Sequence, residues 1–257
     1  GSNIDTFISS KQDLVGHLDL SACTNITLIQ ADKNDLTSIS TASTAIQSYN
    51  VASNAIVTAH DVSSWASLAY FKINNNQIPS LIFGSHASLG QVIFQSNPIA
   101  NTPDLSACPS ITAVFAYLTD IPGLVLNTTP NYHSVFRSLH CYSNTSFNTV
   151  INLSGCSALE LFLFHDNPSA LAINYGSIST IETLRIYSSS QSGTFPLSQF
   201  PDIEEAEIQG NSFTDVSVAT HNSLIEFNAS SNDIDTPELD TIINAFWGFR
   251  TGSASSS

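Results

Sequence analysis

Residues 68–78 read LAYFKINNNQI, with apolar side chains at the first, fourth, sixth and eleventh places and asparagine at the ninth. The alternation of apolar and polar residues at the centre of this stretch predicts a short β-strand, because successive side chains of a strand point to opposite faces. The asparagine predicts a turn after the strand, where its amide can satisfy backbone groups that would otherwise lack a partner. This frame is the unit from which the fold is predicted.

The frame recurs ten times along the chain, at intervals of 20 to 25 residues. Eight copies keep asparagine, whereas Thr119 and Ser189 replace it in the fifth and eighth. In the sixth and seventh copies the last apolar residue comes late, at Phe147 and Leu171. Such a period predicts a solenoid, in which each repeat buries its apolar side against its neighbours. The copies begin at Ile26, Ile46, Leu68, Leu89, Ile111, Phe136, Leu159, Ile181, Ile203 and Leu224.

Over about residues 14–249 the frame resembles the leucine-rich-repeat family, whose pattern is L-x-x-L-x-L-x-x-N-x-L. A Leu-Ser-x-Cys box at residues 20–23, 105–108 and 153–156 resembles the short repeats of bacterial and bacteriophage surface proteins. The resemblance implies a horseshoe with one concave parallel sheet of about ten strands, an irregular convex side and a ladder of stacked asparagines. A right-handed parallel β-helix is the alternative fold, although it would usually show three strand segments per turn and only one alternates cleanly here.

The predicted organisation has four parts. Residues 1–25 form an N-terminal cap that begins with a cloning remnant, and residues 26–235 form the ten repeats. Residues 236–250 form a C-terminal capping helix, with Thr236 as N-cap and Pro237 as the first helical residue. Residues 251–257 are expected to be a tail or linker, and the chain is expected to be a fragment of a longer protein. Phe7, Leu14, Val15, Leu18 and Leu20 are expected to build the N-terminal cap.

The charge balance excludes several classes of partner. The sequence has 6 Lys and Arg against 21 Asp and Glu, a formal net charge of −15. Nucleic-acid binding depends on basic residues that neutralise phosphates, and anionic membranes attract basic segments, so both partners are disfavoured. The sequence also lacks an apolar stretch of about 18 residues, which argues against a membrane span.

The sequence shows no motif of a metal or cofactor site and no nucleophile motif, so we expect neither a cofactor nor catalysis. The four cysteines, at positions 23, 108, 141 and 156, are predicted to be buried thiols, since equivalent residues two repeats apart are too distant for a disulfide. Five histidines in connecting segments are expected to be surface residues: His17, His60, His86, His133 and His221.

Residues between the apolar places of each strand are predicted to point outward from the sheet. When the repeats are aligned, repeats five to nine bring a set of aromatic and charged residues side by side, whereas the other repeats carry mainly small or amide residues. Exposed aromatic clusters often mark binding sites, and Tyr and Arg are typical anchors. Aromatic pairs on neighbouring strands also stabilise a sheet without any ligand. The predicted site is Phe115, Tyr117, His140, Tyr142, His165, Arg185, Tyr187, Glu205 and Glu207.

Three functions follow from these observations. The first is an extracellular recognition domain at a bacterial cell surface or fibre tip, which binds a cell-surface glycan or protein through the concave face. The second is a structural spacer whose aromatic face is covered by another domain or by sister chains of a fibre. The third is a glycan-cleaving enzyme, because Glu205 and Glu207 share one strand face at a separation of about 6–7 Å, near that used by glycosidases.

Overall fold

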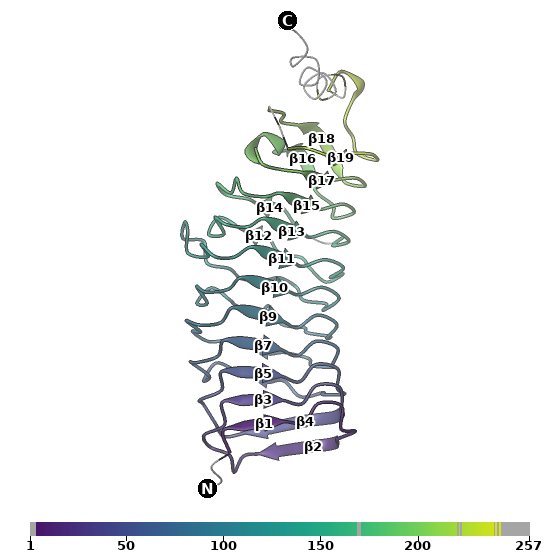
Figure 1. Cartoon of the computed structure of the whole chain (residues 1–257). Coiled ribbons are helices and arrows are strands. Elements are labelled where there is room, and N and C mark those ends of the chain that lie inside the picture. Colours follow the sequence, from purple (N-terminus) through teal and green to yellow (C-terminus); the bar gives the residue numbers. More distant parts are fainter. Residues whose placement is uncertain are drawn as a thin grey trace, which may run out of the picture.

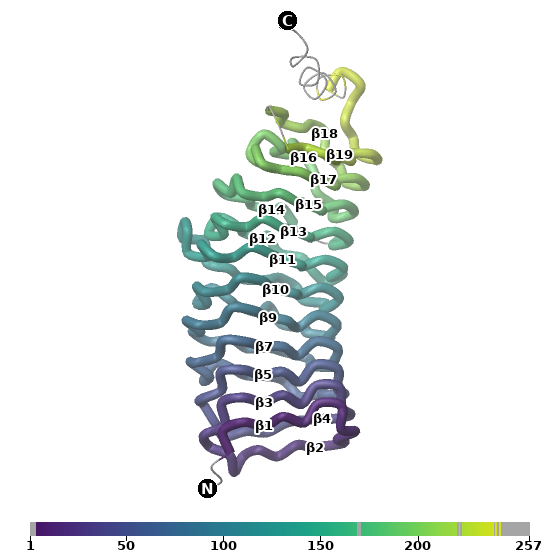
Figure 2. The backbone as a smooth tube through the Cα atoms, in the orientation of Figure 1, coloured from purple at the N-terminus to yellow at the C-terminus, as the bar shows by residue number. Residues whose placement is uncertain are grey.

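The computed structural model describes residues 4–168, 171–219, 221, 223–238, 240 and 242. The chain winds into coils that stack in a nearly straight column, with the N-terminus at one end and the C-terminus at the other (Figures 1 and 2). One strand of each coil joins a single long parallel sheet, so the predicted solenoid is confirmed.

The long sheet has eleven parallel strands, and each contains only three residues. The register between strands follows the repeat frame, so the fourth place of one repeat pairs with the fourth place of the next: Phe71 pairs with Val92, and Val92 with Val114. The strands, in spatial order, are β1 (Thr6–Ile8), β3 (Leu28–Gln30), β5 (Ser48–Asn50), β7 (Tyr70–Lys72), β9 (Gln91–Ile93), β10 (Ala113–Phe115), β11 (Ser138–His140), β13 (Leu161–Leu163), β15 (Thr183–Arg185), β17 (Glu205–Glu207) and β19 (Glu226–Asn228).

The back of the column, opposite the long sheet, is more regular than the sequence predicted. Four short parallel pairs form there, β2 with β4, β6 with β8, β12 with β14 and β16 with β18. A 3-10 helix spans Leu197–Gln199. The back strands are β2 (Val15–Leu20), β4 (Asp35–Thr41), β6 (His60–Asp61), β8 (Leu81–Ile82), β12 (Ile151–Asn152), β14 (Ile173–Asn174), β16 (Ser192–Phe195) and β18 (Ser212–Val216).

A continuous apolar core runs up the middle of the column. The first, fourth and sixth places of the frame point inward, as at Leu68, Phe71 and Ile73, which are fully buried. Full burial of one such side chain stabilises the fold by about 1.5–3 kcal/mol. No coil holds a closed core of its own, so this stabilisation depends on stacking.

The asparagine ladder is present and ties each coil to the one before it. Asn76 donates from Nδ2 to the carbonyl of Ile73 in its own coil, at 2.9 Å, and to that of Val51 in the preceding coil, at 3.0 Å. Its Oδ1 accepts from the backbone N–H of Ile56, at 3.1 Å. The same pattern holds Asn97 and Asn211. Because these backbone groups are buried, the asparagine amides supply the hydrogen-bond partners that water would otherwise have to supply.

The residue just before the ladder position has a left-handed backbone in all ten repeats. Its φ lies between 51° and 66°, a region that residues other than glycine enter at a cost in free energy. Only one repeat places glycine there. The residues are Lys33, Ser53, Asn75, Ser96, Leu118, Ser143, Asp166, Ser188, Gly210 and Ser231.

An eleventh coil precedes the ten predicted repeats. Strand β1 pairs with β3, so that Phe7 lies beside Ile29. Ile4, Phe7 and Leu14 stand in the repeat frame with Gln12 at the asparagine place, and this match was the sequence signal for the extra coil. Phe7, Leu14 and Leu18 pack against the core and Leu20 is buried, but Val15 is 73% exposed and does not contribute to a cap.

The expectation that five histidines lie on the surface was wrong for four of them. His60, His86, His133 and His221 are buried, and only His17 is exposed. Three of the four stand three residues before a repeat's first apolar place, the position that Cys23, Cys108 and Cys156 hold in other repeats. The side chain at this position points inward, so cysteine and histidine occupy equivalent core sites. All four cysteines are buried and none forms a disulfide, as predicted.

At the C-terminal end, residues 236–238, 240 and 242 are helical. The helix cap is Asp235 rather than Thr236, because the Asp235 carboxylate accepts the backbone N–H of Glu238 at 3.0 Å. Ile242 is buried in the core. The rest of the predicted capping helix, at 243–250, lies outside the described residues, as do the predicted tail at 251–257 and the remnant at residues 1–2. Leu171, expected in the core, is 55% exposed.

Within the described ranges, we find no helix with the length and apolarity needed to cross a membrane.

Candidate functional site

The long sheet sets the spacing of every side chain on its outer face. Strands β10, β11, β13, β15 and β17 are consecutive neighbours in perfect register, so residues at the same place of the frame stand in columns. Parallel strands lie about 4.8 Å apart, which is a suitable distance for stacking of rings. The nine predicted site residues come from these five coils, and all are half-buried on the same face.

The outermost column is a continuous stack of four rings, which we call the aromatic ladder: Tyr117, Tyr142, His165 and Tyr187. Successive ring centroids are 4.5, 4.4 and 4.3 Å apart, and the ring planes differ by 3°, 17° and 14°. Stacking covers the inner ring faces, so the ladder presents ring edges and phenol groups outward. The Nδ1 of His165 lies 2.9 Å from the Asp166 carboxylate, a partner that sequence reasoning missed.

A second column stands two residues earlier in each repeat, on the last residue of each strand. Phe115 stacks on His140 with centroids 4.5 Å apart, and Leu163 and Arg185 continue the column. The Nε2 of His140 lies 2.8 Å from the Ser138 hydroxyl. Burial lowers the pKa of His140 from its ordinary value, because desolvation disfavours the imidazolium. This column is therefore apolar at one end and cationic at the other.

The cationic end is neutralised by the next strand. Arg185 contacts Glu205 from Nη2 at 2.5 Å and from Nε at 2.7 Å, and its Nε lies 2.8 Å from Glu207. Burial opposes ionisation of Glu205, but hydrogen bonds with Glu207 and Arg185 outweigh it and lower the pKa of Glu205. One guanidinium facing two carboxylates leaves a net negative charge.

This geometry argues against the glycosidase hypothesis. A glycosidase needs one carboxyl with a raised pKa as general acid. At this site the pKa of Glu205 is lowered, and the same arginine contacts both carboxylates. The contacts of both carboxylates with the guanidinium show instead that the pair holds a cationic group.

The structure brings all nine residues together on one face, with neighbouring rings stacked as aligning the repeats suggested, while their role in binding stays a prediction. The contacts of Arg185 with Glu205 and Glu207 were not predicted. Metal-ligating groups do not gather in threes anywhere in the described part of the chain.

No family model and no curated protein matches the sequence. Similar folds exist among solved structures. The functional domain of InlJ from Listeria monocytogenes, described as including a cysteine ladder, superposes with a TM-score of 0.52 at 16% identity over 91% of this chain. The fold is that of a leucine-rich-repeat solenoid. This chain spans 59% of the length of that Listeria structure.

Two further solved structures match less closely. A leucine-rich-repeat protein of Leptospira interrogans has a TM-score of 0.35 at 11% identity, covering 86% of this chain and 76% of its own. YopM, a leucine-rich effector protein of Yersinia pestis, has a TM-score of 0.32 at 13% identity, covering 90% of this chain and 84% of its own.

Proposed function

We propose that this chain is a non-catalytic recognition domain that binds a protein partner through the outer face of its long sheet. The contact surface comprises the aromatic ladder, Phe115, His140 and the Arg185–Glu205–Glu207 cluster. The observation that supports this most is the concentration of these residues in five adjacent coils, in a column whose other coils present mainly small and amide side chains on this face. Stability alone would require no such concentration.

A protein partner suits the ladder better than a glycan does. Sugars pack their apolar faces on exposed aromatic faces, but the ladder rings cover one another at 4.3–4.5 Å. Only edges and hydroxyls are offered, and these suit the carbonyls, hydroxyls and apolar side chains of a protein. Tyr and Arg are also the residues most enriched where protein interfaces hold their binding energy.

The partner is expected to be basic where it meets Glu205, Glu207 and Glu226. These carboxylates face outward from neighbouring strands and Arg185 balances only one of them. With a net charge of −15, the chain steers a basic surface toward this end of the sheet. We further propose that the partner lies on a cell surface, in keeping with the resemblance of the Leu-Ser-x-Cys boxes to repeats of bacterial and phage surface proteins.

The test is binding of the purified domain to bacterial and animal cells, either untreated or treated with protease or with glycosidases. The informative variant is Tyr142→Ala/Tyr187→Ala, and Tyr70→Ala on the same sheet face outside the ladder is the matched control. We expect binding that protease abolishes, that the double variant loses and that Tyr70→Ala retains. Each variant is first checked for an unchanged far-ultraviolet circular dichroism spectrum.

Binding that survives protease but not glycosidase treatment would replace the protein partner with a glycan. Equal binding by wild type and double variant, or binding by neither, would favour the spacer, in which stacking serves only the stability of the sheet.

A further inference from the structure

The back of the column has a break between its first and second strand pairs. Strand β4 pairs with β2 and β6 pairs with β8, but within the described chain β4 and β6 are not paired with each other. On this side of the column, these two coils are joined near the start of β4, where Ala55 N–H donates to the Leu36 carbonyl and Val57 N–H donates to the Thr37 carbonyl. The interval between the first apolar places of these repeats, Ile26 and Ile46, is 20 residues, the shortest in the chain. A short coil leaves the back incompletely filled.

The inward side chain at this break is also the smallest of its column. Three residues before each repeat's first apolar place, nine repeats carry a thiol, a ring or a branched apolar group, and this one carries Ser43. The Ser43 hydroxyl donates to the Ile26 carbonyl at 2.7 Å. The equivalent residues are Cys23, Trp65, His86, Cys108, His133, Cys156, Ile178, Phe200 and His221. A hollow therefore opens where the other repeats fill the space with a larger group.

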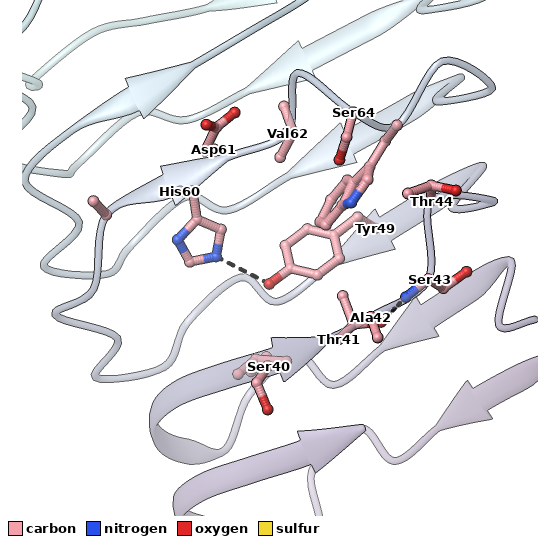
Figure 3. A pocket seen from close by; sticks show the side chains of 13 residues that line it. Ser40, Thr41, Ala42, Ser43, Thr44, Tyr49, His60, Asp61, Val62 and Ser64 are labelled. Atoms are coloured by element: carbon pink, nitrogen blue, oxygen red, sulfur yellow. Dashed lines mark hydrogen bonds between the residues drawn. The ribbon is translucent and has the colours of Figure 1, made fainter. Parts of the chain in front are cut away.

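The hollow is a cavity of about 280 Å³ (Figure 3). Its floor is formed by the buried side chains of Tyr49, His60 and Trp65, and its rim by exposed residues that include Thr44 and Ser64. This volume lies just below the lower end of the range typical of small-molecule sites, about 300–1,000 Å³. It suits one small ring and not a peptide.

A polar pair lies in the floor although the surrounding core is apolar. The Tyr49 hydroxyl lies 2.9 Å from Nε2 of His60 (Figure 3). Nδ1 of His60 lies 3.1 Å from the Thr58 carbonyl. Since Nδ1–H donates to that carbonyl, Nε2 accepts the Tyr49 hydroxyl proton. The phenol oxygen thus keeps its lone pairs for a donor in the cavity. The pair therefore places a hydrogen-bonding oxygen at the floor of a cavity whose surroundings are otherwise largely apolar.

The lining selects the charge and chemistry of a ligand. None of its residues, all of which the structure describes, is Lys or Arg, and Asp61 supplies one carboxylate, so anions are disfavoured. Besides Tyr49, five lining residues carry hydroxyls: Ser40, Thr41, Ser43, Thr44 and Ser64. The Trp65 and Tyr49 rings are tilted by 55° and do not cover each other face to face, in contrast to the rings of the aromatic ladder.

We propose that this cavity binds a neutral, hydroxyl-bearing ring of monosaccharide size. Ligand hydroxyls donate to the Tyr49 oxygen and to Asp61 and exchange hydrogen bonds with Thr44 and Ser64, while an apolar ring face packs on Trp65. The site lies on the back of the column, so it is independent of the protein surface proposed for the long sheet.

Fluorescence of Trp65 reports occupancy directly. The sequence contains one other tryptophan, Trp247, so a Trp247→Phe protein isolates the signal. It is titrated with glucose, galactose, mannose and N-acetylglucosamine, with choline and glucose 6-phosphate as charged probes. Each responding sugar is repeated as the terminal unit of an oligosaccharide. We expect a saturable change in emission with at least one neutral sugar and none with the charged probes.

The filled-cavity variant is Ser43→His in the same Trp247→Phe background. The fold accepts histidine at this position, as at His86 and His133, so the variant should stay folded while its affinity falls by about tenfold or more. Tyr142→Ala/Tyr187→Ala should leave the sugar response unchanged, which separates this proposal from that for the sheet face. Tighter binding of the oligosaccharide identifies a glycan end as the source, and equal binding identifies the free sugar.

Three results would overturn the proposal: no response to any neutral sugar, a response only to choline or to the phosphate, or an equal response by Ser43→His.

Discussion

Asn144 accepts two hydrogen bonds from Thr119, which precedes it by 25 residues: one from the backbone N–H at 2.9 Å and one from the hydroxyl at 2.7 Å. Both residues are fully buried. Threonine is too short to extend the asparagine ladder, and its hydroxyl joins the next rung instead while also lying 3.0 Å from the Ala116 carbonyl. This pair holds the ladder together at its middle.

Asn144→Ala is therefore expected to destabilise the fold strongly. The variant removes the side-chain amide that accepts from the backbone N–H and hydroxyl of Thr119 and donates to the Ala116 carbonyl. Each buried group left without a hydrogen-bond partner costs about 1–3 kcal/mol. We expect a loss of about 3 kcal/mol or more in the free energy of unfolding, measured by urea denaturation. Asn232→Ala, on a half-exposed rung near the C-terminal end, should cost distinctly less. Equal costs would show that burial does not set the strength of the ladder.

The buried histidines predict a loss of stability in mild acid. Burial lowers the pKa of His60, His86, His133 and His221 in the folded state, whereas the unfolded chain titrates near 6.5. As the pH falls below about 6.5, the unfolded state therefore binds more protons than the folded state. The free energy of unfolding decreases from its value above pH 6.5 as the pH approaches the lowered pKa values of the folded state. Each histidine that stays neutral contributes a slope of up to about 1.4 kcal/mol per pH unit.

Thermal melts between pH 8 and pH 5 would show this slope. Hydrogen bonds from Ser21 and Ser40 hold the pKa of Asp19 at about 2, so this carboxyl titrates below the range of the melts. His133→Cys, which copies the residue at Cys108 and Cys156, should reduce the slope. A flat profile between pH 6.5 and pH 5 would contradict the expectation.

Thiol labelling tests the interior positions of the cysteines. Burial raises the pKa of Cys108 to about 11 and that of Cys156 to about 12, and it also raises the pKa of Cys141. Since the thiolate is the reactive form, all three should resist iodoacetamide at pH 8 in the native protein and react fully in urea. Rapid labelling of Cys108 without urea would mean that this part of the back opens readily.

Leu118 should be replaceable with a gain in stability. It has φ 55° and is 55% exposed, so it bears the cost of a left-handed conformation and buries little apolar area. Leu118→Gly removes a strain of about 1–2 kcal/mol, offset in part by the greater freedom of glycine in the unfolded chain. We expect a net gain of about 0.5–1 kcal/mol by denaturant titration.

The converse variant is Gly210→Ala, at the glycine that holds this place in the ninth repeat with φ 66°. It should lower stability by a similar amount. Opposite signs for the two variants are the result that supports a strained turn position in every repeat.

Much of the candidate site could be predicted from the sequence because the repeat frame converts sequence intervals into positions on a sheet. Once Phe115 and His140 are assigned to the same place of successive frames, their proximity follows. The spacing does not determine how the rings tilt or that Arg185 turns toward β17, since these depend on rotamers chosen among neighbouring side chains. The cavity beside Tyr49 escaped prediction for a similar reason, because it arises where the back strands β4 and β6 of two neighbouring coils do not pair.

The sequence by itself determined the solenoid, its repeat positions, its asparagine ladder and the residues that share the outer face of the sheet. These features depend on a pattern of apolar and amide residues that repeats at a nearly constant interval, and such a pattern buries its core only by stacking. The tertiary structure alone decided that four histidines lie inside, that Arg185 is held by two carboxylates and that a cavity opens beside Ser43. In each case the deciding quantity is the space and charge supplied by an adjacent coil, which no single repeat encodes.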